Sequence, residues 1–138
     1  MKPVLLDTGV IVALLDRSER YHQQCTAALK NLASPLVTCE AVIAESCYLL
    51  RDLPGAPEAV LANVERSLFQ IPFQLSRSAA PVRRLLRKYR DLPIDLADAC
   101  LIALAEELGT GEILSLDRDF QVYRWARSRP FRLLVPMS

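Results

Sequence analysis

The chain has 138 residues, of which 51% are hydrophobic and 24% are charged, and its formal net charge is +1. This length supports one domain with a substantial core and is too short for two, and the composition excludes a disordered chain. We therefore expect residues 1–138 to form a single globular domain, whose net charge by itself says nothing about nucleic acid.

The first half of the chain alternates between strand-like and helix-like patterns. Short buried apolar runs predict strands, and apolar residues at helical spacing predict helices. In chain order, these patterns predict a strand at 2–7, a helix from there to about residue 15, a helix at 21–32, a strand at 36–38 and helices at 40–51 and 57–69. The last two helices are separated by the breaker DLPGAP.

The second half continues this alternation and indicates a fold class. It predicts a strand at 72–75, helices at 80–90 and 95–108, and strands at 113–116 and 131–135. Strands separated by helices indicate an α/β fold with a parallel sheet covered on both faces, and we expect the strands at 4–6 and 113–116 in its centre. In such sheets the ligand crevice lies beyond the carboxyl ends of the strands.

Two acidic residues lie at predicted strand ends. Asp7 follows the apolar run VLL, and Asp117 follows EILSL. Each could cap the element that follows it, which is the commoner role of an isolated Asp before a helix. A buried carboxylate nevertheless costs several kcal/mol unless something compensates its charge, roughly as for any desolvated ion. The position of these two acids therefore calls for a compensating partner.

Two further acids lie at apolar positions of predicted helices. Glu45 falls away from the solvent-facing stripe that Glu40 and Arg51 mark on their helix. Asp98 lies among apolar residues of its helix, whereas Asp95 falls near the polar side. Structural explanations exist for both, because a Glu stem can lie along an apolar edge and an Asp in the first turn favours the helix dipole. The capping and helix-dipole explanation accounts well for Asp95 and less well for Asp98, whose neighbours on the helix are apolar.

Taken together, Asp7, Glu45, Asp98 and Asp117 form a pattern that single explanations do not cover. Four carboxylates can share a pocket only with a cation, and neither Asp7 nor Asp98 has a Lys or Arg beside it in the sequence. A cluster of oxygen ligands without His or Cys suits Mg²⁺, with Mn²⁺ as a second choice. Such ions turn water into a nucleophile and act on phosphate esters.

The cysteines and the hydropathy exclude other classes of protein. Cys25, Cys39, Cys47 and Cys100 form no C-x-x-C pair and the chain has one His, so we expect reduced, buried thiols and no zinc site. No run approaches the roughly 18 apolar residues of a membrane helix, and the amino-terminal segment is not typical of a signal peptide. We expect a cytoplasmic protein without membrane attachment.

The basic residues are unevenly distributed. Eleven of the 17 Lys and Arg residues fall between Arg77 and Arg132. One helix side carries Arg83, Arg84, Arg87, Lys88 and Arg90, and a second cluster is Arg118, Arg124, Arg127, Arg129 and Arg132. A solvated helix face is the usual explanation of such a pattern. An acidic centre with basic flanks is also what a metal-dependent nuclease requires, because its substrate is a polyanion.

Four segments in order resemble the PIN-domain nucleases and, within them, the VapC-type toxins of bacterial toxin–antitoxin pairs. These segments are LLDTGVIVALLD, VIAESCYLL, IDLADACLIALAEELG and ILSLDRDF. Each motif is weak alone, but the ordered set spans residues 4 to about 124. The resemblance assigns the metal-binding acids to Asp7, Glu45, Asp98 and Asp117, and suggests Thr8 and Ser115 as assisting hydroxyls.

The resemblance also implies a fold and a function. The fold is a three-layer α/β/α sandwich with a mostly parallel central sheet. The activity is Mg²⁺-dependent endoribonucleolytic hydrolysis of RNA, and the implied partners are a cognate antitoxin protein and a second copy in a homodimer. The basic residues Arg83, Arg84, Arg87, Lys88 and Arg118 are then candidates for substrate binding.

Three alternatives stay open on the sequence. The chain could be a PIN-like module without catalysis that binds RNA or protein, although such a module has no need of all four acids. It could also be an RNA-processing nuclease that is not a toxin. Finally, Asp91, Asp95 and Asp119 lie near the assigned acids, so the ligand set could differ; we interpret Asp95 and Asp119 as caps or supporting residues.

Overall fold

The computed structural model describes residues 2–136, which fold around one parallel sheet. Its five strands run in the order β3-β2-β1-β4-β7. They are β1 (Val4–Leu6), β2 (Leu36–Val37), β3 (Phe69–Gln70), β4 (Glu112–Leu114) and β7 (Arg132–Leu133). Strand β1 lies between β2 and β4, with Leu5 opposite Val37 and Ile113. The central positions predicted for β1 and β4 are confirmed, and all of β1 is buried.

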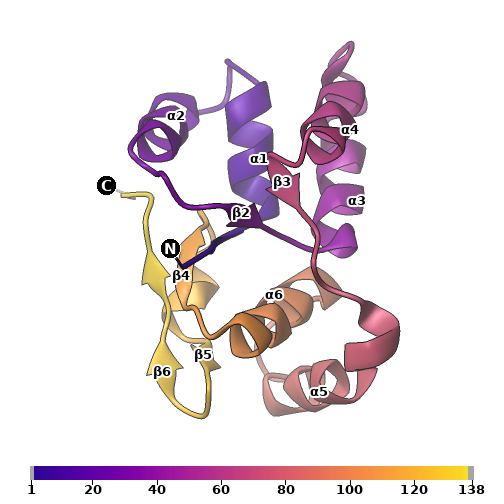
Figure 1. Cartoon of the computed structure of the whole chain (residues 1–138), viewed down its shortest axis with the longest axis vertical. Coiled ribbons are helices and arrows are strands. Elements are labelled where there is room, and N and C mark those ends of the chain that lie inside the picture. Colours follow the sequence, from indigo (N-terminus) through magenta and orange to yellow (C-terminus); the bar gives the residue numbers. More distant parts are fainter. Residues whose placement is uncertain (1, 137–138) are drawn as a thin grey trace.

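Helices cover both faces of this sheet, as Figure 1 shows. They are α1 (Thr8–Leu15), α2 (His22–Lys30), α3 (Glu40–Leu49), α4 (Ala56–Glu65), α5 (Leu75–Lys88) and α6 (Leu96–Leu108). In this view α1 to α4 lie above the strands, and the pair α5 and α6 lies below them. The predicted α/β sandwich with a mostly parallel sheet is confirmed. Within the described residues, no helix combines the length and the hydropathy needed to cross a bilayer.

The region between α4 and α5 differs from the prediction. The predicted helix at 57–69 ends at Glu65, because Ser67 adopts a left-handed φ of 62° and turns the chain. The buried side chain of Phe69 then joins the sheet beside Leu36. The strand predicted at 72–75 is wrong: β3 lies before it, and Leu75 begins α5.

Helix α5 begins earlier than predicted because it consists of two parts. Ser78 has non-helical φ and ψ of −115° and 15°, which separates a short first part from the main helix. The main part therefore begins near the predicted residue 80. Pro81 lies in its first turn, where the missing N–H of proline costs no helical hydrogen bond.

An antiparallel hairpin between β4 and β7 was not predicted. It follows the 3₁₀ helix η1 (Arg118–Gln121) and consists of β5 (Arg124–Trp125) and β6 (Arg129–Pro130). Its turn places Ala126 and Arg127 at φ of 46° and 77°, a conformation that neither residue type signals. Trp125 packs directly on Gly111, where an added Cβ would lie 2.0 Å from the indole nitrogen.

Candidate active site

The ends of the two central strands place the first two acids. Strands β1 and β4 are parallel neighbours, so the residues that follow them meet at one edge of the sheet. Asp7 caps α1 by accepting a hydrogen bond at Oδ1 from the Thr8 N–H at 2.8 Å. Asp117 caps η1 in the same way, with the Asp119 N–H 2.9 Å from Oδ1. Each cap uses one carboxylate oxygen, so both acids can cap the following helix and still lie at the crevice.

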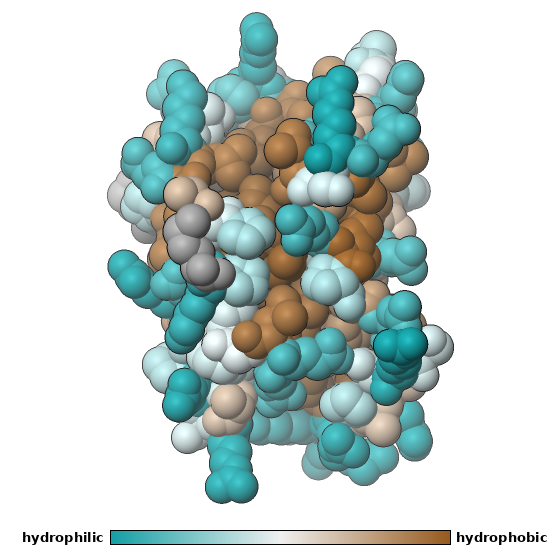
Figure 2. Space-filling model, viewed as in Figure 1, coloured by the Kyte–Doolittle hydropathy of each residue, from teal (hydrophilic) through white to brown (hydrophobic). Residues whose placement is uncertain are grey.

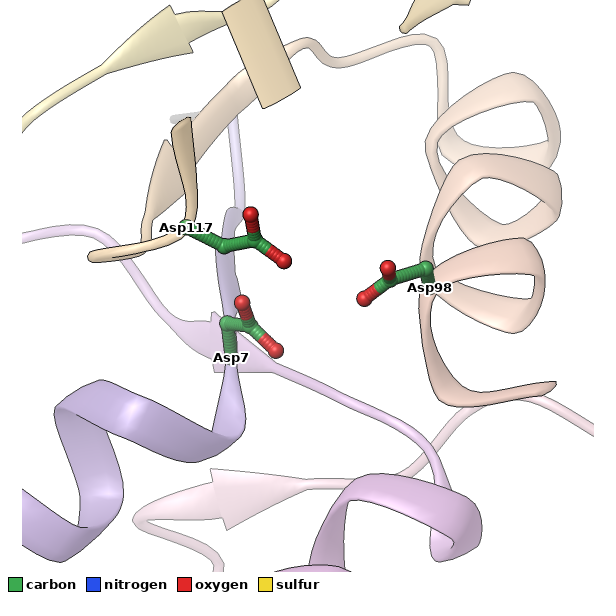
Figure 3. A group of neighbouring side chains, drawn as sticks. All are labelled: Asp7, Asp98 and Asp117. Carbon is green, nitrogen blue, oxygen red and sulfur yellow. The ribbon is translucent and has the colours of Figure 1, made fainter. Parts of the chain in front are cut away.

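Helix α6 brings the third acid to the same place. Asp95 is its N-cap and accepts a hydrogen bond from the Asp98 N–H at 2.8 Å, which positions Asp98 in the first turn. Asp7, Asp98 and Asp117 each offer a carboxylate oxygen, and these oxygens lie within 4.8 Å of one another. Figure 3 shows Asp98 extending from its helix toward the two strand-end acids.

Helix α3 contributes the fourth acid. Glu45 lines a pocket of about 310 Å³ together with Asp7, Asp98 and Asp117, so the four acids selected from the sequence surround one cavity. Its Oε1 accepts a hydrogen bond from the Thr8 hydroxyl at 2.6 Å. Glu45 lies outside the tight group formed by the other three acids. Thr8 connects it to that group, because the Thr8 N–H donates to Asp7 and the Thr8 hydroxyl donates to Glu45. The cavity also contacts Asp95.

Ser115 ties the two strand-end acids together. Its hydroxyl donates a hydrogen bond to Asp7 Oδ2 at 2.7 Å and accepts one from the Asp117 N–H at 3.0 Å. Ser115 is fully buried, so these contacts are protected from competing water. Both hydroxyls suggested by the resemblance, on Thr8 and Ser115, thus bind a predicted acid directly.

Tyr123 is a site residue that the sequence did not reveal. It is fully buried, and its hydroxyl donates a hydrogen bond to Asp98 Oδ2 at 3.1 Å. The edge-to-face ring of Tyr89, 5.0 Å away between centroids, fixes its orientation. Because Tyr123 lies between η1 and β5, where no element was predicted, the only available signal was an aromatic residue soon after Asp117.

Burial makes these carboxyl groups weak acids. It raises the pKa of Asp7 to about 6, although hydrogen bonds from Ser115 and the Thr8 N–H act in the opposite direction. Burial, followed by the charges of Asp95, Asp7 and Asp117, raises the pKa of Asp98 to about 8. The pKa of Asp117 is also raised, again mainly by burial. When these carboxyl groups are ionised, their burial and mutual repulsion are unfavourable, and a bound cation would compensate both effects.

The donors fit a hard divalent cation. The tight group offers carboxylate oxygens, and within residues 2–136 no lysine or arginine lines the cavity. Oxygen ligands without nitrogen or sulfur are those that Mg²⁺ and Mn²⁺ prefer. Neither Asp91 nor Asp119 lines the cavity, whereas Asp95 does.

The basic residues selected as substrate contacts lie outside the cavity. They are placed on two elements: Arg83, Arg84, Arg87 and Lys88 on α5, and Arg118 at the start of η1. Helix α5 packs on α6, the helix that carries Asp98, and Arg118 directly follows Asp117. These side chains are at the surface, where they can meet a polyanion, but none of them lines the acidic cavity.

Comparisons with known proteins agree with this architecture. The family model described as PIN domain matches residues 4–126. A protein named Ribonuclease VapC26, from Mycobacterium tuberculosis, is 30% identical over 117 residues, covering 83% of this chain and 87% of that protein. The crystal structure of VapC20 from the same organism, titled a sarcin-ricin loop cleaving toxin, matches with a TM-score of 0.81 and 18% identity, covering 92% of this chain and 99% of that one.

Proposed function

The chain belongs to the PIN-domain family, and from this premise we propose that it is a Mg²⁺-dependent endoribonuclease, the toxin of a type II toxin–antitoxin pair. The observation that carries the proposal is the group of three carboxylate oxygens within 4.8 Å of one another. Two findings support it: the pKa of each of the three acids is raised, and among the described residues no Lys or Arg lines their cavity. Capping uses one oxygen of Asp7 and one of Asp117, but it does not explain why Asp98 lies beside them.

The proposed roles follow from the contacts of each side chain. Asp7, Asp98 and Asp117 would hold the ion, which when bound lowers the pKa of water and stabilises charge on the attacking and leaving oxygens of a phosphodiester. Ser115 and Tyr123 orient the Asp7 and Asp98 carboxylates through their hydrogen bonds. Glu45 keeps Oε2 free of the Thr8 hydrogen bond, so we assign to it the orientation of the attacking water across the cavity.

Cleavage of RNA should require a divalent ion. We expect purified protein to cut end-labelled single-stranded or structured RNA with Mg²⁺ or Mn²⁺, to stop in EDTA, and to recover when excess Mg²⁺ is restored. The reason is that no His, Lys or Cys lines the cavity to act as nucleophile or base among the described residues. Gel analysis of the products measures this. Undiminished cleavage in EDTA would overturn the metal-dependent mechanism.

We also propose that the basic face of α5, with Arg118, binds the RNA backbone. Arg84→Ala or Lys88→Ala should weaken RNA binding and lower the slope of log affinity against log salt by roughly 0.7 to 0.9 for each phosphate that the variant no longer neutralises. The affinity for Mg²⁺ should not change, because neither side chain lines the cavity. Fluorescence anisotropy in EDTA measures the binding without cleavage.

Arg66→Ala is the matched control for these variants. Arg66 is also exposed, but it lies at the carboxyl end of α4 rather than on α5. Its removal should leave the salt slope close to that of the unchanged protein. An equal decrease of the slope in all three variants would show that the basic residues of α5 contribute no more to RNA binding than another exposed arginine does.

The proposal includes partners and a compartment. From the VapC-type relative we infer a cognate antitoxin protein, a homodimer and action in the cytoplasm. Apolar side chains support a partner surface: Tyr48 and Leu49 on α3 and Leu61 on α4 are more than half exposed, and Leu49 also lines the acidic cavity. Figure 2 shows further hydrophobic residues gathered over the upper half of one face, around α1 and α4.

A further inference from the structure

Two cysteines from distant parts of the chain meet away from the acidic cavity. Cys39 is the N-cap of α3, and Cys100 lies one turn into α6, a helix that packs against α3. Both side chains are buried, and both line a mostly apolar pocket of about 270 Å³. Because Cys100 and Asp98 are two residues apart on a helix, they face different sides of it, and only Asp98 reaches the acidic cavity.

The two thiols lie on the wall of the same pocket and interact with each other there. A hydrogen bond from the Cys39 thiol to the Cys100 sulfur raises the pKa of Cys39 and lowers that of Cys100. The other two cysteines lie in different surroundings. Cys25 is enclosed in the core, where burial alone raises its pKa to about 11, and the Cys47 thiol points to the Pro57 carbonyl oxygen at 4.0 Å. Among the four free thiols, Cys39 and Cys100 are therefore the two that line one pocket together.

The pocket gives small molecules a route to the pair. Its lining includes Leu75, Leu96 and Ala44, all of which are exposed, so the pocket opens to solvent. Glu40, also at its edge, is the one charged residue that lines it among the described residues. The two sulfurs with this single acid do not resemble a zinc site, which needs four ligands of nitrogen, sulfur or oxygen. An uncharged oxidant is better suited to enter such an apolar opening.

We propose that Cys39 and Cys100 form a dithiol site that a peroxide oxidises to a disulfide. One thiol attacks the peroxide oxygen, becomes a sulfenic acid and releases one water; the other thiol displaces a second water as the S–S bond forms. In sum, two thiols and one hydrogen peroxide give one disulfide and two waters. The bond joins the start of α3, which carries Glu45, to α6, which carries Asp98.

Mass spectrometry tests the site on the full-length protein. The reduced protein is treated with hydrogen peroxide, denatured and alkylated. We expect two of the four cysteines to escape alkylation, a mass loss of two hydrogens, and a tryptic cross-link between peptides 31–51 and 91–118. A reductant should reverse all three changes. Four alkylated cysteines, or sulfinic acid without a cross-link, would refute the proposal.

Two variants and one physical measurement sharpen the result. Cys47 shares a tryptic peptide with Cys39, so the Cys47→Ala protein should still cross-link, which assigns the bond to Cys39; Cys100→Ala should not. If Cys100→Ala fails to fold, the peptide map of the unchanged protein still decides. Oxidation should raise the melting temperature by on the order of 10 °C, because it closes a long loop in the unfolded chain. A lower melting temperature would contradict a pair already placed for the bond.

Discussion

Changing Asp98 to asparagine should abolish RNA cleavage while leaving the fold intact. Asparagine keeps the shape of the side chain, and its amide oxygen can still accept the hydrogen bond from Tyr123. It removes the charge that, in our proposal, Asp98 contributes to holding the ion. The loss should exceed the roughly 10- to 100-fold decrease that is typical when only a residue supporting a metal ligand is changed. Initial rates of RNA cleavage at saturating Mg²⁺ measure it.

Asp91→Asn is the matched control for this experiment. Asp91 is an exposed acid shortly before α6, and it does not line the cavity. This variant should cleave RNA at nearly the unchanged rate. Circular dichroism must show the same helix content in both variants. Normal cleavage by a folded Asp98→Asn protein would end the assignment of Asp98.

The metal-free protein should lose stability as the pH rises from about 4 to about 8. The carboxyl of Asp98 has an ordinary pKa of 3.8 and a folded-state pKa of about 8, and Asp7 shifts from 3.8 to about 6. Between these values the folded protein binds more protons than the unfolded chain, so the free energy of unfolding falls with rising pH. Urea unfolding in EDTA at several pH values measures the effect.

The same Asp98→Asn change separates this effect from other titrations. It should remove most of the slope that remains between about 6 and 8, because in that range the folded protein still holds the Asp98 proton, which the unfolded chain has lost, whereas Asp7 has largely ionised. Its advantage in stability over the unchanged protein should therefore be largest at pH 8 and above. Saturating Mg²⁺ should remove that advantage, because the ion stabilises the charged carboxylates. If the free energy of unfolding in EDTA instead increased with pH, the folded state would not raise the pKa of these acids.

The four acids could be selected from the sequence because each violates a simple expectation. Asp7 and Asp117 stand directly after or close behind buried strands, and Glu45 and Asp98 stand on apolar helix positions. Parallel strands bring their ends together whatever the details of the loops, so the convergence of Asp7 and Asp117 followed from topology. Topology does not predict that Glu45 lies apart from the other three acids. That separation depends on side-chain contacts such as the hydrogen bond from Thr8.

The parts that were not predicted depend on contacts without a local pattern. Tyr123 reaches Asp98 because β5, which directly follows it, packs on α6. The left-handed turn at Ala126 and Arg127 contains no Gly or Asn that would have predicted it. The strand at 72–75 was misplaced because Phe69 and Phe73 are both buried, and apolar content alone cannot tell which one pairs with β2.

The strand order delays assembly of the acidic group during synthesis. Strand β1 is made first, yet its partner β4 comes from residues 112–114, and Ser115, Asp117 and Tyr123 follow later still. On the ribosome, Asp7 therefore waits for most of the chain before the acids can come together. A nascent chain that carries only Asp7, Glu45 and Asp98 lacks Asp117 and the Tyr123 contact, so under the function proposed above the RNA being translated meets no complete acidic cavity until the polypeptide has passed Tyr123.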